Sequence, residues 1–556
     1  MPGLATTAPA IVVLGASALD TARRIQRLYT AAQVHGLSGR ADEVDRPYEN
    51  FGEHLRDLYR ANTPIIALCA AGIVIRSLST ALGDKDNEPP VLVVSEDGSA
   101  VVPLLGGLAG VNRMAREIAA ELEVNTAITT SGELRFGACL LSPPPGYVLA
   151  DLEQGKRFVS DLLAGAPVRV EGPAPWLDGL KLPLDPHAQH LVTISPLRQN
   201  DDSTLSIHPL QVAIHVEHGG PELDAEVQQL IDASGFSPRS LACLIAPLDL
   251  MTDAELQQVA SQLDLPIRFS DDIKQLPPQH SRSQRTRLLL ADEPIDIEKI
   301  GLPRGSLTVI GLGPGAPVFM VPAARQALDG AQDLLGYETY IRMAGPLKPG
   351  QVSHSSDNRE ELQRAGHAFE LAASGRRVVV ISSGDPGVFA MAAAVLEALH
   401  ASSDPRWHAV DLQILPGVSA ALATAAKAGA PLGHDFCMLS LSDNLKPWAM
   451  IEKRLEHAAA ADLVMAFYNP ISKARPWQLG RALEIVRQQH SPETLVVLGR
   501  DVGRPAETLT VTTLGKLTPE QVDMRTLVII GSSQTCRFAK PGGGDWVYTP
   551  RSFPSH

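Results

Sequence analysis

The sequence predicts an α/β protein with several domains. Short apolar runs rich in β-branched residues, such as Val378 to Ile381, alternate along the chain with segments of helical pattern. Many of these runs end in turns rich in glycine and proline, and 556 residues are too many for one ordinary core. Because parallel strands need a crossover between them, usually a helix, the alternation predicts parallel sheets covered by helices.

Residues 1–142 are expected to form a small α/β domain. A glycine turn follows its first apolar run, and a second glycine cluster, Gly106 to Gly110, opens a helix. The predicted strands are 9–15, 64–70, 91–94, 101–105 and 126–130, and the predicted helices are 18–36, 50–62 and 111–122.

The middle of the chain changes in composition twice. Proline and glycine become frequent around residues 143–185, so 143–204 is expected to be an irregular region. Residues 205–270 predict a second compact unit, with strands 212–216 and 240–248 and helices 221–234 and 253–263. Residues 271–303 are rich in charge, proline and glutamine, which is typical of a linker.

From residue 304 to 556 strands and helices alternate again, in two lobes expected at about 304–430 and 431–556. The predicted strands are 307–310, 378–381, 412–414, 436–441, 463–467, 494–498 and 526–530. The predicted helices are 321–331, 390–399, 421–428, 447–459 and 477–489.

Five loops of small or polar residues each end an apolar strand in this half of the chain. The carboxyl ends of parallel strands are where open α/β sheets bind small molecules, and glycine lets a ligand approach the main chain. Asp385 adds an acceptor for hydroxyl or ammonium donors. The loops, which together predict a cleft between two lobes, are 311–317, 382–388, 416–420, 468–470 and 499–501.

Composition disfavours two classes of partner. The net charge of −14 disfavours nucleic acid, and no apolar run approaches the length of a membrane-spanning helix. Five cysteines lie far apart without a CxxC pair, so we expect a reducing, cytoplasmic compartment. Residues three apart on a strand point to opposite faces, so His215 and His218 would not reach the same ion, and we expect no metal site there.

Three loop sequences resemble those of the tetrapyrrole methylase family. They are Gly-Leu-Gly-Pro-Gly at 311–315, Gly-Asp-Pro at 384–386 and Pro-Gly-Val-Ser-Ala at 416–420, and the resemblance covers about 306–548. It implies a two-lobed domain that uses S-adenosylmethionine as methyl donor and forms a homodimer. Segments 440–448 and 467–472 are similar to the branch that methylates precorrin-3B at C17, with ring contraction to precorrin-4, in cobalamin biosynthesis.

The resemblance also implies which residues form the site. A tetrapyrrole substrate carries several carboxylates, which arginine, lysine or histidine would bind. Ring contraction needs a proton removed from a tertiary alcohol, and Asp443 and Asp501 are the candidates. Cofactor contacts are expected at Gly313, Pro314, Gly384, Asp385, Val388, Phe389, Ser419, Ala420, Tyr468 and Thr526. Substrate contacts are expected at Arg342, His354, Lys473, Arg475, Arg500 and Arg504.

The N-terminal half resembles the cobalt-precorrin-5A hydrolase family. The similar segments are Gly72 to Arg76, Asp84 to Asp86, Val91 to Gly98 and Ile128 to Thr130. Leu108 stands where that family has a histidine, and a leucine cannot transfer protons. His215 to Gly219 replaces the family's Gly-Cys-x-x-Gly turn, and the C-terminal unit is expected to be truncated. We therefore expect a degenerate accessory or substrate-binding module, with possible transient contact to other enzymes of the pathway.

Several alternatives stay open on the sequence alone. One is a cobalt-precorrin-3 methyltransferase fused to an active cobalt-precorrin-5A hydrolase. Another is a ribosomal RNA methyltransferase of the same fold, which the acidic charge disfavours. A dinucleotide-dependent oxidoreductase lacks the ribose-binding acid, and a non-catalytic tetrapyrrole carrier would not need the methyl-donor loops.

Overall fold

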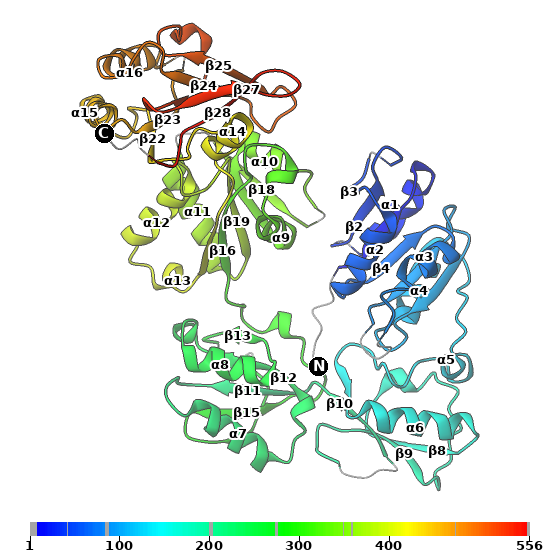
Figure 1. Cartoon of the computed structure of the whole chain (residues 1–556). Helices are drawn as coiled ribbons and strands as arrows, with labels where there is room; N and C mark the ends of the chain where they lie inside the picture. The colour runs from blue at the N-terminus through cyan, green and yellow to red at the C-terminus, as the bar shows by residue number, and fades with distance from the viewer. Residues whose placement is uncertain are drawn as a thin grey trace. The chain divides into compact units, whose positions relative to one another are not determined.

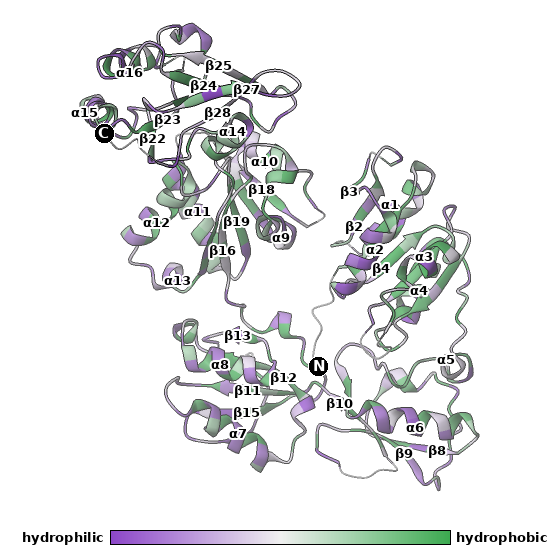
Figure 2. Ribbon diagram, viewed as in Figure 1, coloured by the Kyte–Doolittle hydropathy of each residue, from purple (hydrophilic) through white to green (hydrophobic). Residues whose placement is uncertain are grey.

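The computed structural model folds into two compact units (Figure 1). The first unit is Met1–Arg304 with Lys348–Gly350, and the second is Gly305–Leu347 with Gln351–His556. The structure describes residues 8–29, 31–41, 43–83, 88–199, 204–272, 276–348, 350–356, 360–472 and 474–552. Strands are predominantly apolar and helices carry polar residues on their outer faces (Figure 2), which confirms the predicted α/β class.

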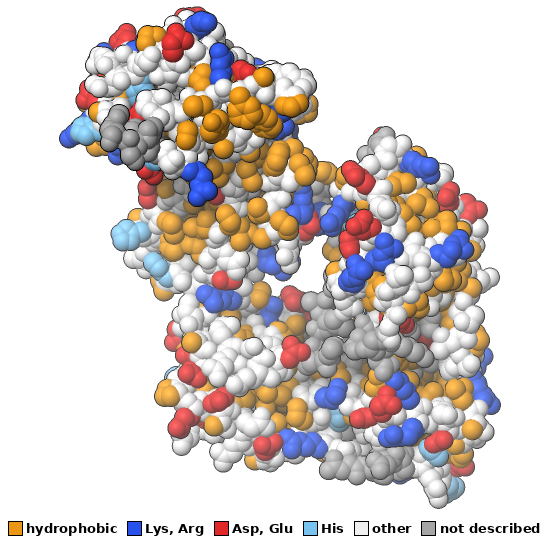
Figure 3. Space-filling view, in the orientation of Figure 1, with side chains coloured by type: hydrophobic (Ala, Val, Ile, Leu, Met, Phe, Trp, Pro, Cys, Tyr) orange, Lys and Arg blue, Asp and Glu red, His pale blue; other side chains and the backbone are white. Residues whose placement is uncertain are grey.

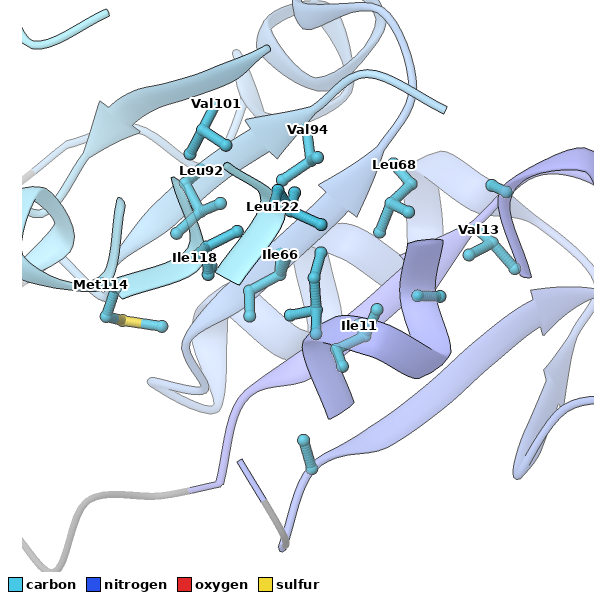
Figure 4. Packing of buried hydrophobic residues seen from close by; sticks show 14 of the residues in the cluster. Ile11, Val13, Ile66, Leu68, Leu92, Val94, Val101, Met114, Ile118 and Leu122 are labelled. Carbon is cyan, nitrogen blue, oxygen red and sulfur yellow. The ribbon is translucent and has the colours of Figure 1, made fainter. Parts of the chain in front are cut away.

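The first unit begins with a six-stranded sheet in the order β3-β2-β1-β4-β5-β6, parallel except for β6. Alternate strand residues face opposite sides, so α1 and α4 cover one face and α2 and α3 the other. Figure 4 shows one of these cores, in which Met114, Ile118 and Leu122 of α4 meet the strands. The elements are β1 (Ala10–Val13), α1 (Leu19–Leu28), β2 (Gln33–Leu37), β3 (Arg46–Tyr48), α2 (Phe51–Arg60), β4 (Ile65–Leu68), α3 (Ala71–Leu78), β5 (Val91–Val94), β6 (Val101–Leu105) and α4 (Val111–Leu122).

Two expectations for this domain are wrong. Residues 18–36, predicted as one helix, form two elements. Helix α1 ends at Leu28, and strand β2 follows with its central residues buried beside β1. Gly36 of β2 leaves no room for a side chain against Val44, which explains why the strand carries little apolar signal. The predicted strand 126–130 is reduced to a single bridge between Thr126 and Val101.

The region expected to be irregular is a small α/β layer. Its four strands lie in the order β7-β10-β9-β8, and α6 covers them with the buried residues Phe158 and Leu162. Proline and glycine punctuate the connections rather than preventing the sheet, so this expectation is wrong. The elements are α5 (Ser131–Phe136), β7 (Tyr147–Leu149), α6 (Leu152–Leu163), β8 (Val168–Glu171), β9 (His190–Ile194) and β10 (Thr204–Pro209).

The predicted linker 271–303 is also wrong, because it completes a five-stranded sheet in the order β13-β12-β11-β15-β14. Leu288 of β15 pairs with Ile214 of β11, and both are fully buried. The unit therefore does not stop near residue 270. Its elements are β11 (Val212–Val216), α7 (Leu223–Ser234), β12 (Leu241–Ala246), α8 (Ala254–Leu263), β13 (Ile267–Phe269), β14 (Gln279–Arg282) and β15 (Thr286–Leu290).

The charges that resemble a linker are paired within this sheet. Arg287 forms an ion pair with Glu217, and Arg285 Nε lies 2.9 Å from Glu226 Oε2. Each of these two guanidinium groups is paired with a carboxylate, so its charge is compensated within the sheet. The charged residues therefore do not prevent Leu288 from being buried in the core.

The second unit opens with an all-parallel sheet in the order β18-β17-β19-β16-β20. Helices α11 and α12 pack on one face, and α9 and α10 on the other. The elements are β16 (Ser306–Gly311), α9 (Pro322–Gly330), β17 (Asp333–Tyr337), α10 (Glu338–Ala344), β18 (Val352–Ser356), α11 (Glu361–Ala373), β19 (Arg377–Ser382), α12 (Met391–Ala401), α13 (Pro405–His408) and β20 (Asp411–Leu415).

A second sheet in this unit has the order β22-β23-β26-β24-β25, with α15 and α16 on one face and α14 on the other. A small third sheet joins β21, β28 and β27. The elements are α14 (Ala420–Ala428), β21 (Gly429–Ala430), β22 (Phe436–Ser440), α15 (Trp448–Ala460), β23 (Val464–Tyr468), α16 (Gln478–Arg487), β24 (Leu495–Arg500), β25 (Thr508–Thr513), β26 (Thr526–Ile530), β27 (Cys536–Ala539) and β28 (Asp545–Tyr548). Over the described residues, no helix combines the length and apolar character needed to cross a bilayer.

The position of β15 gives a stability test. Leu288→Ala is expected to lower the free energy of unfolding by about 2–5 kcal/mol, because it leaves a cavity where the fully buried Leu288 side chain lies beside β11. Urea unfolding of the full chain, with hydrogen exchange at the β11 amides, measures the loss. Leu134→Ala, at an exposed position, is the matched control. Equal effects of the two substitutions would contradict the assignment of residues 286–290 to the core sheet.

Candidate functional site

The loops at the carboxyl ends of β16 and β19 are joined through their main chains. Gly313 N–H donates to the Gly384 carbonyl at 3.1 Å, and Gly384 N–H donates to the Gly313 carbonyl at 2.8 Å. Leu312 N–H donates to the Ser382 carbonyl at 2.9 Å, which continues the contact from the parallel ladder below. These two loops therefore form one edge rather than two independent segments.

The carboxylate of Asp385 fastens this edge. Its Oδ1 accepts a hydrogen bond from Gly387 N–H at 2.8 Å, and its Oδ2 accepts one from Gly417 N–H at 2.9 Å. Hydrogen bonds from main-chain amides to a carboxylate are among the stronger ones in proteins. Asp385 thus links the loop after β19 to the loop after β20, which gives it a positioning role at the site.

Glycine is required where these loops touch. A Cβ at Gly311 would lie 2.1 Å from the Gly384 carbonyl oxygen, and one at Gly417 would lie 2.3 Å from the same atom. Gly313 and Gly384 have φ of +73° and +68°, in the left-handed region that glycine adopts without cost. We call Gly311, Gly313, Gly384 and Gly417 the glycine cradle. It exposes main-chain groups that a ligand can approach closely.

Two aromatic side chains stand beside the cradle. Phe389 has φ of +54° and is 50% exposed, although it is a large apolar residue. Its ring centroid lies 5.3 Å from that of Tyr468, which comes from the end of β23 in the other sheet. A strained, exposed aromatic at a strand-end turn is a feature of binding sites.

Tyr468 connects the second sheet to the loops of the first. Its hydroxyl accepts a hydrogen bond from Ala421 N–H at 2.9 Å, in the first turn of α14. Burial raises the pKa of Tyr468, the nearby charge of Asp385 adds to the rise, and a hydrogen bond with Ser419 opposes it. The phenol therefore stays neutral and fixes the start of α14 through its hydrogen bond with Ala421.

Sequence reasoning placed ten residues around the cofactor, and nine of them lie in or beside these loops. The tenth, Thr526, lies at the start of β26, between the ends of β23 and β24, and donates its hydroxyl to Asp523 Oδ1 at 2.8 Å. The nine are Gly313, Pro314, Gly384, Asp385, Val388, Phe389, Ser419, Ala420 and Tyr468.

Asp501 is the centre of an ion-pair cluster. It is 6% exposed, and its carboxylate lies 3.3 Å from Arg500 Nη1, 3.8 Å from Arg504 Nη1 and 3.1 Å from Arg525 Nη1. Arg504 also donates to the Pro314 carbonyl at 3.2 Å, so the cluster ties the second lobe to the loop after β16. Sequence reasoning missed Arg525, because it lies outside the strand-end loops in the sequence.

The remaining predicted residues are more scattered. Asp443 is partly buried and accepts a hydrogen bond from Gln478 Nε2 at 3.2 Å. Arg342 is exposed on α10, and Arg475 donates to the Asn469 carbonyl at 3.2 Å. Lys473 lies outside the described residues.

His354 is not brought to the loops. Its Nε2 lies 2.9 Å from Asp333 Oδ1, and Asp333 is the first residue of β17, at the amino ends of the strands. Arg376, just before β19, also hydrogen-bonds Asp333. The prediction that His354 binds substrate beside the cleft is therefore wrong, because its register on β18 directs it to the opposite edge of the sheet.

The two halves of the chain match different families of known proteins. The family model for tetrapyrrole (corrin/porphyrin) methylases matches residues 306–518. A precorrin-3B C(17)-methyltransferase from Sinorhizobium sp is 51% identical over 249 residues, which are 45% of this chain and 97% of that protein. The chain belongs to the tetrapyrrole methylase family. Its cofactor is S-adenosylmethionine, the methyl donor of that family, and it is a methyltransferase.

Other relatives share the same half. Cobalamin biosynthesis protein CobIJ from Mycobacterium bovis is 47% identical over 254 residues, and the match spans 45% of this chain and about half, 49%, of that relative. A crystal structure of the methyltransferase CobJ is 52% identical, with a TM-score of 0.42, and the match covers 44% of this chain and 100% of that one.

The N-terminal half has its own match. The family described as cobalamin synthesis G N-terminal matches residues 53–133 of this methylase, which confirms the expected fusion. Thr130, in one of the similar segments, accepts a hydrogen bond from Asn112 Nδ2 at 3.0 Å. Leu108 is half-buried in the turn before α4 and brings no proton-transfer group there. Asp84 to Asp86 lie outside the described residues.

The cradle gives a binding test. Gly417→Ala is expected to weaken S-adenosylhomocysteine at least about tenfold, because the new methyl group would separate the loops that Asp385 and Gly384 hold together. Calorimetric titration of the full chain measures the change. Gly330→Ala is the matched control in the same unit, since no atom lies within 4 Å of its Cβ position. An unchanged affinity for Gly417→Ala would remove the cradle from the site.

Asp333 gives a pH test. Burial opposes ionisation of this 1% exposed carboxyl, but hydrogen bonds from Arg376 and His354 outweigh burial and lower its pKa. Its contribution to stability is therefore present above the ordinary aspartate pKa, about 3.9, and is lost as pH falls through the lower folded value.

Asp333→Asn is accordingly expected to lower the free energy of unfolding by about 1–3 kcal/mol at pH 7. The difference from wild type should shrink as the pH falls below about 4, because the unfolded chain then binds a proton at residue 333 more readily than the folded chain does. Urea unfolding across pH measures both. Asp411→Asn, at the exposed first residue of β20, is the control, and a pH-independent difference would contradict the ion-pair account.

Proposed function

We propose that this methylase transfers the methyl group of S-adenosylmethionine to C17 of precorrin-3B and promotes the ring contraction that yields precorrin-4. The observation that carries this proposal is the 51% identity to a precorrin-3B C(17)-methyltransferase over 97% of that protein. The reaction would place the chain in cobalamin biosynthesis. The other substrates of the fold, including cobalt-precorrin-3 and ribosomal RNA, are not favoured.

The site fits a methyl donor. The cradle presents bare main chain where side chains would block approach, and the aromatic pair Phe389 and Tyr468 adjoins it. S-adenosylmethionine supplies an electrophilic methyl on a sulfonium, so the protein needs no nucleophile or metal of its own. Its residues align the two reacting carbons and exclude water, which accounts for a large part of the rate of such transfers.

For ring contraction we propose Asp443 rather than Asp501 as the proton acceptor. Asp443 follows β22, is partly open to solvent, and receives one hydrogen bond from Gln478. Asp501 is buried and faces three guanidinium groups, so its role is to position those arginines. A general base must reach the proton it removes, and only Asp443 of the two has a free approach.

For substrate carboxylates we propose Arg342 and Arg475, which have exposed or partly exposed guanidinium groups, with Arg500 and Arg504 acting through the Asp501 cluster. Among the described residues, no group of three or more His, Cys, Asp or Glu side chains is arranged to hold a metal ion.

We propose that residues 1–303 form an accessory module that holds tetrapyrrole and has lost hydrolase activity. Leu108 in place of the family's histidine supports loss of activity. We place the methylase domain at 304–556, with lobes meeting near residue 430, because α14 begins in a loop of the first sheet and packs on the second.

We also propose that the methylase domain forms a homodimer. Large apolar side chains are exposed on this unit, as the space-filling view illustrates (Figure 3), and they include Leu362, Leu396, Ile414 and Leu422. Such exposure is typical of surfaces that bind protein.

The five cysteines are free, which supports a cytoplasmic location.

The reaction gives the direct test. Full-length protein incubated with S-adenosylmethionine and precorrin-3B is expected to release S-adenosylhomocysteine and a product heavier by one methyl group. Mass and absorption spectra of the product report methylation and ring contraction separately. Gly417→Ala should reduce turnover at least about tenfold, while Gly330→Ala retains it. Turnover only with a cobalt-containing or later intermediate would contradict the substrate assignment.

A further inference from the structure

Lys446 brings a positive charge from the second lobe to the loops of the first. It lies between β22 and α15, and its Nζ is 5.8 Å from the centroid of the Phe389 ring. Phe389 follows the Gly-Asp-Pro turn and contacts Tyr468. The ammonium therefore lies over an aromatic side chain that follows closely, in the chain, on Gly384 of the glycine cradle.

No acidic side chain balances this ammonium within the described part of the chain. Burial lowers the pKa of Lys446, and the positive charge of Arg454 lowers it further. A partly buried cation in the field of a second positive charge is unfavourable unless an anion accompanies it. The face of Phe389 compensates only in part, since a cation over an aromatic ring contributes about 0.5–1 kcal/mol at exposed sites.

The surroundings of Lys446 indicate what kind of anion it takes. Phe389 and Tyr468 offer aromatic surface next to the ammonium, and Phe389 is held half-exposed by a backbone conformation that is strained for its type. A ligand that matches both features has a flat apolar ring system with carboxylates at its rim. A small inorganic anion would use the charge and leave the aromatic surface uncovered.

We infer that Lys446 anchors a peripheral carboxylate of the tetrapyrrole substrate, and that Phe389 packs against the macrocycle beside it. This inference rests on the proposed function and adds a binding residue to that site. Lys446 sets where the macrocycle lies relative to the donor, so it acts on substrate affinity and orientation rather than on S-adenosylmethionine.

Three variants of the full chain test the role of the charge. Lys446→Met keeps length and apolar packing but removes the charge, whereas Lys446→Arg keeps the charge. Lys540→Met is the matched control, because Lys540 Nζ also lies over an aromatic ring, 4.1 Å from the Trp546 centroid, on the β27–β28 hairpin.

Lys446→Met is expected to raise the KM for precorrin-3B about tenfold and to leave S-adenosylhomocysteine affinity within about twofold of wild type. Lys446→Arg should recover most of the loss, and Lys540→Met should behave as wild type. An unchanged KM in Lys446→Met overturns the inference. So does an equal loss of S-adenosylhomocysteine affinity, which would mean that Lys446 only supports Phe389.

A binding measurement keeps the inference testable if precorrin-3B is not the substrate. Uroporphyrin III, a stable polycarboxylate macrocycle, is titrated into each variant at low and high salt, and fluorescence reports binding. Lys446→Met should weaken binding and flatten its salt dependence, because one screened charge contact is gone. Equal salt dependence in wild type and Lys446→Met overturns the inference, whereas absent turnover of precorrin-3B by wild type overturns only the proposed substrate.

Discussion

The Gly384 carbonyl and the Asp385 carboxylate hold together the loops that we propose as the methyl-donor site. The carbonyl accepts the Gly313 amide and lies where any side chain at Gly311 or Gly417 would be, and the carboxylate accepts the Gly417 amide. Three loops are thus fixed at contact distance by groups that belong to two consecutive residues. A single added methyl group in the cradle acts on all three loops at once.

The same edge connects the two lobes of the methylase. Tyr468 from the second sheet accepts the Ala421 amide at the start of α14, and Arg504 donates to the Pro314 carbonyl. Asp501 in turn gathers Arg504 with Arg500 and Arg525. Ion pairs and hydrogen bonds are directional, so they fix the lobe geometry more closely than apolar contact alone. The chemistry of methyl transfer depends on such alignment.

Sequence reasoning succeeded where local pattern and tertiary role agree. Strands β11 and β26 and helix α4 have the predicted bounds, because their large apolar residues are buried in the sheet or against it. The strand-end loops were also found, since glycine there answers a local steric need. Nine of the ten residues proposed to contact the methyl donor lie in or beside these loops.

The failures share a cause, which is that a distant partner decides the outcome. Residues 271–303 look like a linker until Glu217 and Glu226 are seen to pair with the arginines of the hairpin. His354 looks like a substrate ligand beside the loops until its position on β18 is seen to bring it to Asp333. Both cases need knowledge of which strands are neighbours.

Lys446 also depends on a distant partner, but here the acidic partner is missing. It lies in a segment that the sequence singled out, yet only the fold shows that its ammonium meets the Phe389 ring and no acidic side chain among the described residues. A partly buried charge in this state favours an anionic ligand.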